Sequence, residues 1–217
     1  SLPMDFFFEC QYKAMVSATP IEINDPRFEE QGFQILKVKP TFEYKRDINL
    51  WITNNLLQTV KEVLAKVEDK TCFLFCNSTD MIYALMKQLN ILDKSAVFCS
   101  DKSVDKLKGL NFKSANSTWN EKNMKHYNWL TSRFYNAVDI EIKECPNVLF
   151  LTDCYIAEYT MFDPNTDIIQ CAGRFRNGIT SLSLISNINK GFPIRNRDYL
   201  NGCIQCSKDI YDMIKCL

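Results

Sequence analysis

The sequence of 217 residues has little of what marks the specialised protein classes. Its 6 glycines and 7 prolines exclude collagen-like and low-complexity chains. It has no excess of charge of either sign, because 26 lysines and arginines balance 26 aspartates and glutamates. A nucleic acid or another anion would therefore have to be held by local basic groups rather than by an overall positive field.

Long apolar runs are also missing. Runs such as residues 149–151 are far shorter than the roughly 20 residues that cross a bilayer. The N-terminus lacks the basic-then-apolar order of a signal peptide. We therefore expect a soluble, cytoplasmic protein, and the hydrophobic content of 46% is enough for a sizeable core.

Metal-binding residues are scarce or scattered. His126 is the single histidine, and the one CxxC pair, Cys203 and Cys206, has no second pair beside it. A structural zinc site therefore lacks its usual four ligands. Several of the ten cysteines lie inside apolar runs. We expect these cysteines to be reduced, and we expect no bound metal.

Apolar patterns along the chain alternate between those of strands and those of helices. Continuous apolar runs predict strands buried on both faces, and apolar residues at intervals of three and four predict the helices between them. The predicted strands lie at residues 6–17, 33–39, 49–52, 72–76, 96–99, 127–131, 148–151 and 181–185. The predicted helices lie at residues 24–32, 54–67, 78–89, 104–107, 164–176 and from 198 onward. This order predicts an α/β fold with an open, mostly parallel sheet.

Polar segments follow several of these strands. In an open α/β sheet, ligands bind beyond the carboxyl ends of the strands. The segments of interest are therefore residues 17–19, 77–79, 131–139 and 170–177.

Residues 170–176 read QCAGRFR. This string resembles motif VI of superfamily 2 helicases and translocases (QxxGRxxR). The resemblance implies that Gln170 and Gly173 lie at the nucleotide and that Arg174 or Arg176 is the catalytic arginine at the γ-phosphate of ATP. A guanidinium group suits that role because it stays charged and makes two parallel hydrogen bonds to phosphate. Arg174 directly follows Gly173, as the first arginine of the motif follows its glycine, and this favours Arg174. The position of the last arginine of the motif is occupied here by Asn177.

Two further segments fall in the order of that family. Residues 17–19 (SAT) resemble motif III, which implies that Ser17 and Thr19 couple two domains. Asn77 and Ser78 fall where motif IV ends its strand, and the resemblance places them at the nucleic acid.

Residues 131–139 (TSRFYNAVD) resemble motif V, with Ala137 where the motif has glycine. The resemblance implies that Thr131 and Ser132 bind the sugar-phosphate backbone of DNA or RNA. It also implies that Asp139 contacts the nucleotide and couples it to the nucleic-acid site.

Neither a GxxxxGK[ST] phosphate loop nor a DExD/H acidic motif occurs in the 217 residues. In the resembled family both belong to a first RecA-like domain. The resemblance therefore implies that residues 46–217 form a second RecA-like domain, the helicase C-terminal domain. Residues 1–45 would be a remnant of the first domain, with the motif III strand and a linker. ATP and Mg²⁺ would be held mainly by the missing N-terminal domain, so we expect the chain alone to be inactive as an ATPase.

Each of these residues also has a plain structural interpretation. Paired arginines on a helix are usually solvated, Thr131 and Ser132 can cap a turn, and Asp139 can do the same. The alternative function is a RecA-like interaction domain without catalytic activity. A hydrolase is disfavoured, because GxSxG is absent and His126 lies in a lysine-rich stretch.

Overall fold

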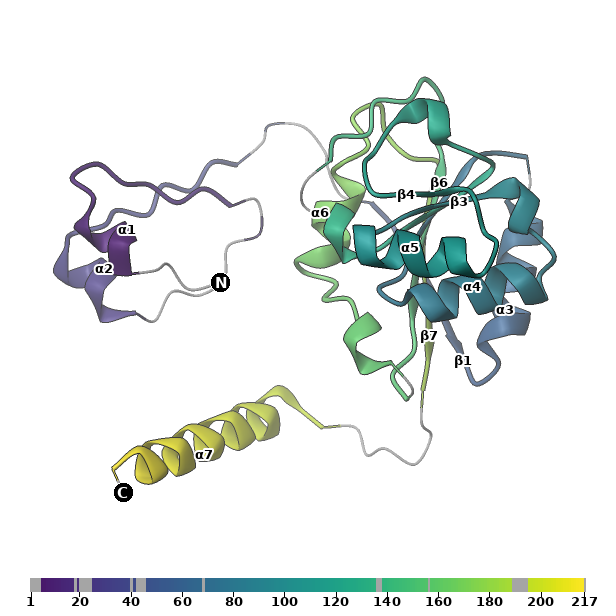
Figure 1. Cartoon of the computed structure of the whole chain (residues 1–217). Helices are drawn as coiled ribbons and strands as arrows, with labels where there is room; N and C mark the ends of the chain where they lie inside the picture. The colour runs from purple at the N-terminus through teal and green to yellow at the C-terminus, as the bar shows by residue number, and fades with distance from the viewer. Residues whose placement is uncertain are drawn as a thin grey trace. The chain divides into compact units, whose positions relative to one another are not determined.

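The computed structural model describes residues 5–17, 19, 25–39, 41, 46–67, 69–135, 138–155, 157–188 and 195–216. The chain divides into two compact units, Ser1–Asn187 and Ile188–Leu217. The larger unit contains the sheet, and the smaller contains one long helix (Figure 1). The predicted boundary between a domain remnant and a second domain at residue 46 stays a prediction.

All neighbouring strands of the sheet are parallel, where the sequence predicted a mostly parallel sheet. Within the described residues, the sheet has seven strands in the order β1-β7-β6-β2-β5-β3-β4. Their bounds are β1 (Asn49–Thr53), β2 (Cys72–Phe75), β3 (Ser95–Phe98), β4 (Ala115–Asn116), β5 (Tyr127–Leu130), β6 (Asn147–Thr152) and β7 (Ser181–Asn187). The short strand β4 has no signal in the sequence.

The central strands are mostly apolar, which fits a sheet that is covered on both faces. β2, β3, β5 and β6 are buried along their whole length. In register, Leu74 of β2 lies between Trp129 of β5 and Leu149 of β6, and all three side chains have no exposed surface. The edge strand β1 is partly exposed, and Lys66 of α3 lies over the ring of its Trp51, 4.4 Å from the ring centroid.

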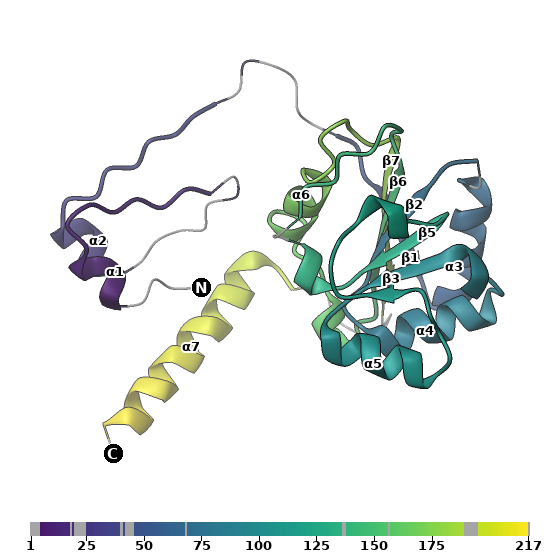
Figure 2. The ribbon, with the colours of Figure 1, turned by 45° about the horizontal axis from the view of Figure 1, so that its top comes forward.

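One face of the sheet is covered by α3 (Leu56–Lys66), α4 (Thr79–Gln88) and α5 (Asp101–Gly109), as Figure 2 shows. Each of these helices begins at a side-chain cap. Asn55 accepts from Gln58 N at 3.1 Å, and Ser78 and Ser100 cap α4 and α5 in the same way. The helices predicted over residues 54–67 and 78–89 match α3 and α4, whereas α5 is longer than the helix predicted over 104–107.

The other face is covered by α6 (Asp167–Ala172), which Figure 2 shows, and by a cluster of aromatic rings. The sequence predicted a longer helix, over residues 164–176. The helix ends earlier because Phe175 instead forms a parallel bridge with Ile140. Ile140 N donates to Arg174 O at 2.8 Å, and Arg176 N donates to Ile140 O at 3.2 Å.

The described N-terminal residues contain two short helices, α1 (Asp5–Glu9) and α2 (Pro26–Glu30). The helix predicted over residues 24–32 is confirmed at Pro26–Glu30, and residue 24 lies outside the described residues. The motif III strand predicted within residues 6–17 is wrong, as is the strand predicted over 33–39: the described residues there contain no strand. Phe7 and Phe8 instead pack with Phe28 and Phe33, with ring centroids 4.8–6.4 Å apart. A strand without a sheet partner is not stable by itself.

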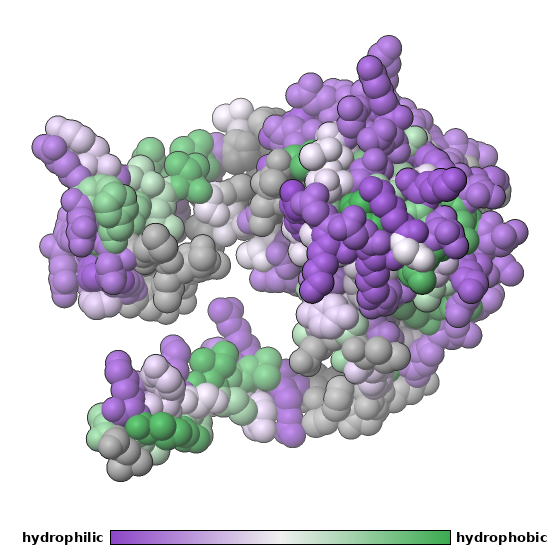
Figure 3. Space-filling model, in the orientation of Figure 1, coloured by the Kyte–Doolittle hydropathy of each residue, from purple (hydrophilic) through white to green (hydrophobic). Residues whose placement is uncertain are grey.

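The smaller unit contains α7 (Arg197–Lys215), which confirms the predicted C-terminal helix. Asn196 caps it by accepting from Tyr199 N at 2.9 Å. None of its described residues is buried, and Figure 3 shows apolar side chains on its visible face. No helix of the described residues has the length and apolarity that crossing a membrane requires.

Short 3₁₀ helices complete the described structure. They are η1 (Leu92–Lys94), η2 (Glu121–Asn123), η3 (Ser132–Phe134) and η4 (Glu158–Thr160).

Candidate functional site

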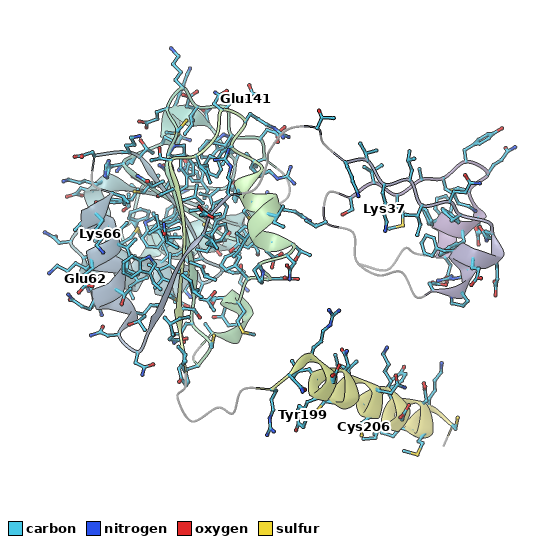
Figure 4. All side chains as sticks on the ribbon, turned by 180° about the vertical axis from the view of Figure 1, so that it is seen from behind. Lys37, Glu62, Lys66, Glu141, Tyr199 and Cys206 are labelled. Carbon is cyan, nitrogen blue, oxygen red and sulfur yellow. The ribbon has the colours of Figure 1, made fainter. Side chains whose placement is uncertain are left out.

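Asp139 brings together the segments that resemble motif V and motif VI. Its Oδ1 atom accepts a hydrogen bond from Arg176 Nη2 at 2.7 Å and lies 3.7 Å from Arg174 Nη1. The exposed fractions of the side chains are 49% for Asp139, 24% for Arg174 and 51% for Arg176. Two guanidinium groups therefore converge on one carboxylate oxygen at the surface. Glu141, two residues after Asp139, marks this loop in Figure 4.

The bridge between Ile140 and Phe175 fixes where the arginines point. Phe175 is 5% exposed, and its ring centroid lies 4.9 Å from that of Phe73 in β2. Side chains alternate between the two sides of a paired segment. With Phe175 in the core, Arg174 and Arg176 both face outward, which lets them share one anion although they are two residues apart.

Each arginine is also tied to the backbone. Arg174 Nε donates to Tyr135 O at 3.2 Å, and Arg176 Nη1 donates to Gly173 O at 3.4 Å. Gly173 has an ordinary helical conformation at the end of α6, but an added Cβ would lie 3.2 Å from Ile169 O. The close turn at Gly173 therefore leaves little space for a side chain there.

Gln170 of α6 contacts the segment that resembles motif III. Its Nε2 atom donates to Thr19 Oγ1 at 2.7 Å. Ser17 Oγ in turn accepts from Thr19 N at 3.1 Å. Two residues 151 positions apart in the sequence thus meet directly, and Ala18 lies outside the described residues.

Asn77 and Ser132 form a second group, beyond the carboxyl ends of β2 and β5. Asn77 Oδ1 accepts from Ser132 N at 3.3 Å, and Asn77 Nδ2 donates to Tyr159 O at 3.3 Å. The other two predicted nucleic-acid residues have engaged hydroxyls. Ser78 caps α4, and the buried Thr131 donates to Phe98 O at 3.4 Å. Contact of the four residues with nucleic acid stays a prediction.

The two groups lie at different ends of the strands. Asn177 Nδ2 donates to Ile142 O and Thr180 N to Pro146 O, both at 2.8 Å, which ties the arginine segment to residues just before β6. α6 runs back along the sheet between two parallel strands, so its C-terminal end reaches their amino ends. Only the Asn77–Ser132 group lies where the sequence led us to expect all the site residues.

The sequence interpretation missed a polar link between the carboxyl ends of β6 and β7. Asn187 Nδ2 donates to Asp153 Oδ1 at 2.7 Å, and Asn187 Oδ1 accepts from Cys154 N at 2.6 Å. The sequence signal that could have indicated this link is the change from apolar to polar residues after the predicted strands at 148–151 and 181–185. The Tyr135 carbonyl, by contrast, has no sequence signal at all.

All ten cysteines are free, and the four buried ones are poor nucleophiles. Burial raises the pKa of each of three thiols, those of Cys72, Cys76 and Cys171, to about 12. Burial also raises the pKa of Cys99, to about 11. The thiolate is the reactive form, so these thiols stay protonated and inert at neutral pH.

We therefore expect two classes of cysteine when the native chain is alkylated at pH 8. The exposed Cys145, Cys203, Cys206 and Cys216 should react first. The buried Cys72, Cys76, Cys99 and Cys171 should react only after denaturant is added. Peptide mapping by mass spectrometry checks this, and labelling of Cys76 in the native chain would contradict the burial of that residue directly after β2.

Comparisons of the chain with models of protein families, with curated proteins and with solved structures found no match. Within the described ranges, no group of three or more histidine, cysteine, aspartate or glutamate side chains could hold a metal ion. The fold and the site define a parallel α/β protein with a surface pair of convergent arginines.

Proposed function

We propose that the chain is the second RecA-like domain of an ATP-dependent nucleic-acid helicase or translocase of superfamily 2. The observation that carries the proposal is the convergence of Arg174 and Arg176 on Asp139. These residues come from the two segments whose sequences resemble motifs V and VI. The hydrogen bond between Gln170 and Thr19 adds a direct contact between the segments that resemble motifs VI and III.

The residues present fit a phosphate group. Arginine has five N–H donors, and the bonds to Tyr135 O and Gly173 O use one on each guanidinium group. Arg176 Nη2 donates to Asp139, Arg174 Nη1 lies 3.7 Å from it, and both arginine side chains are partly exposed. ATP, when bound, supplies the phosphoryl group that is transferred to water. Arg174 or Arg176 would stabilise the charge that develops on it, as arginine fingers do.

The proposal assigns the other ATP contacts and Mg²⁺ to a first RecA-like domain of the same polypeptide. Asn77, Ser78, Thr131 and Ser132 would contribute to the groove for DNA or RNA. Ser17 and Thr19 would couple the two domains. Alternation between open and closed arrangements of the domains would then move the enzyme along the strand.

The 217-residue chain by itself is expected to have no ATPase activity, because it lacks a phosphate loop and a DExD/H motif. Phosphate release from ATP would be measured without nucleic acid and with single- and double-stranded DNA and RNA. Nucleic-acid binding should be weak and lost as salt is raised, since the net charge is zero. Clear turnover by the pure chain would contradict the proposal.

One observation favours the alternative, an interaction domain without catalytic activity. The hydroxyls of Ser78 and Thr131 already have structural partners, as in a domain that binds no nucleic acid. The reading frame upstream of Ser1 separates the two functions. A phosphate loop and an acidic motif encoded there support the helicase, and their absence supports the interaction domain.

A further inference from the structure

We propose that Asp139 is a built-in competitor for the anion that Arg174 and Arg176 bind. Its carboxylate takes the place of a terminal phosphate group and leaves the arginines when the phosphate binds. That the phosphate belongs to ATP rests on the proposed function. The competition between Asp139 and an anion is independent of the proposed function, because it follows from the three side chains alone.

The geometry supports a shared site. Both guanidinium groups approach the same atom, Asp139 Oδ1, at 2.7 Å from Arg176 and 3.7 Å from Arg174. Arginine pairs bind carboxylate and phosphate oxygens with the same planar donors. A phosphate oxygen at the position of Oδ1 would meet the same two groups.

The anchoring of the arginines explains why the site would persist after Asp139 leaves. Arg174 keeps its bond to Tyr135 O, and Arg176 keeps its bond to Gly173 O. Phe175 between them stays in the core. The guanidinium groups are therefore held for an anion by bonds that do not involve the carboxylate.

The exposure of Asp139 explains why it can leave. Its side chain is 49% exposed, so the freed carboxylate is solvated without a large rearrangement. Surface ion pairs of this kind are weak. A phosphate with more than one negative charge can displace the carboxylate, whereas a singly charged anion competes with it poorly.

The test uses the 217-residue chain with tripolyphosphate as the probe and isothermal titration calorimetry as the measurement. Asp139→Asn keeps the size of the side chain and removes its charge. We expect this variant to bind tripolyphosphate roughly tenfold more tightly than the wild-type chain, because two charged donors lose their competitor. Adding Arg176→Ala to Asp139→Asn should remove the gain.

Asp101→Asn is the matched control. Asp101 also pairs with a surface arginine, Arg133, at 3.2 Å, and its loss changes the net charge by the same amount. This variant should bind tripolyphosphate like the wild-type chain. Urea unfolding of all variants confirms that they fold.

The proposal is wrong if Asp139→Asn gains no affinity, or if Asp101→Asn gains as much. These outcomes are separate from the proposed function, which is tested by ATP hydrolysis in the longer polypeptide. If Asp139→Asn binds tripolyphosphate more tightly and Arg174→Ala hydrolyses ATP normally, Asp139 is a competitor for the anion but the proposed helicase function is wrong.

Discussion

In a polypeptide that joins this chain to a first RecA-like domain, Arg174→Ala is expected to lower ATP hydrolysis by roughly 10³ or more. ATP binding should stay largely intact, because an arginine finger stabilises charge that develops only in the transition state. The proposal assigns this role to Arg174, which donates to Tyr135 O and lies with Arg176 at one oxygen of Asp139. Steady-state ATPase assays beside a nucleotide-binding titration measure the two effects separately.

Three further variants sharpen this experiment. Arg174→Lys should not restore hydrolysis, because an ammonium group cannot make the bidentate contact. Arg176→Ala should also reduce hydrolysis, since both guanidinium groups face the same position. Arg197→Ala, which removes an exposed arginine of α7, is the control and should hydrolyse ATP normally. Near-normal turnover in both Arg174→Ala and Arg176→Ala means that these arginines are solvated surface residues.

The parts of the fold that could be predicted are those with a strong local signal. β2 and β6 are continuous apolar runs, and α4 begins at the capping residue Ser78, so their positions follow from short stretches of sequence. β4 has two residues and forms only because β3 lies beside it. Such pairing between distant residues leaves no local pattern.

The errors in the predicted elements have the same origin. The helix predicted to reach residue 176 ends at Ala172, because Ile140 recruits Phe175 into a bridge. The strand predicted within residues 6–17 fails because Phe7 and Phe8 pack with other rings. In both cases contacts between distant residues override the local preference.

For the candidate site, the sequence supplied the residues but not their grouping. The motif order singled out Asp139, Gln170 and the two arginines, and the structure joins Asp139 to Arg174 and Arg176. The contact between Gln170 and Thr19 depends on how the chain folds back, and no spacing in the sequence encodes it. The same holds for backbone acceptors such as Tyr135 O, which any residue type could provide.

Phe175→Ala is expected to have the largest effect on stability at the site. The Phe175 side chain is 5% exposed, and its ring centroid lies 4.9 Å from that of Phe73 and 6.4 Å from that of Phe75. Replacing a buried phenylalanine with alanine leaves a cavity and lowers the free energy of unfolding by about 3–5 kcal/mol. Urea denaturation of the 217-residue chain, followed by circular dichroism, measures this loss.

The same substitution connects packing to anion binding. Phe175 is the anchor that turns its two arginine neighbours outward, so in the Asp139→Asn background Phe175→Ala should also weaken tripolyphosphate binding. Phe175→Leu keeps an apolar anchor and should retain most of that binding at a smaller cost in stability. Ile169→Ala on α6, where the side chain is 52% exposed, is the control and should change neither property appreciably. If Phe175→Ala unfolds at the same urea concentration as the wild-type chain, the aromatic cluster does not hold the arginines in place.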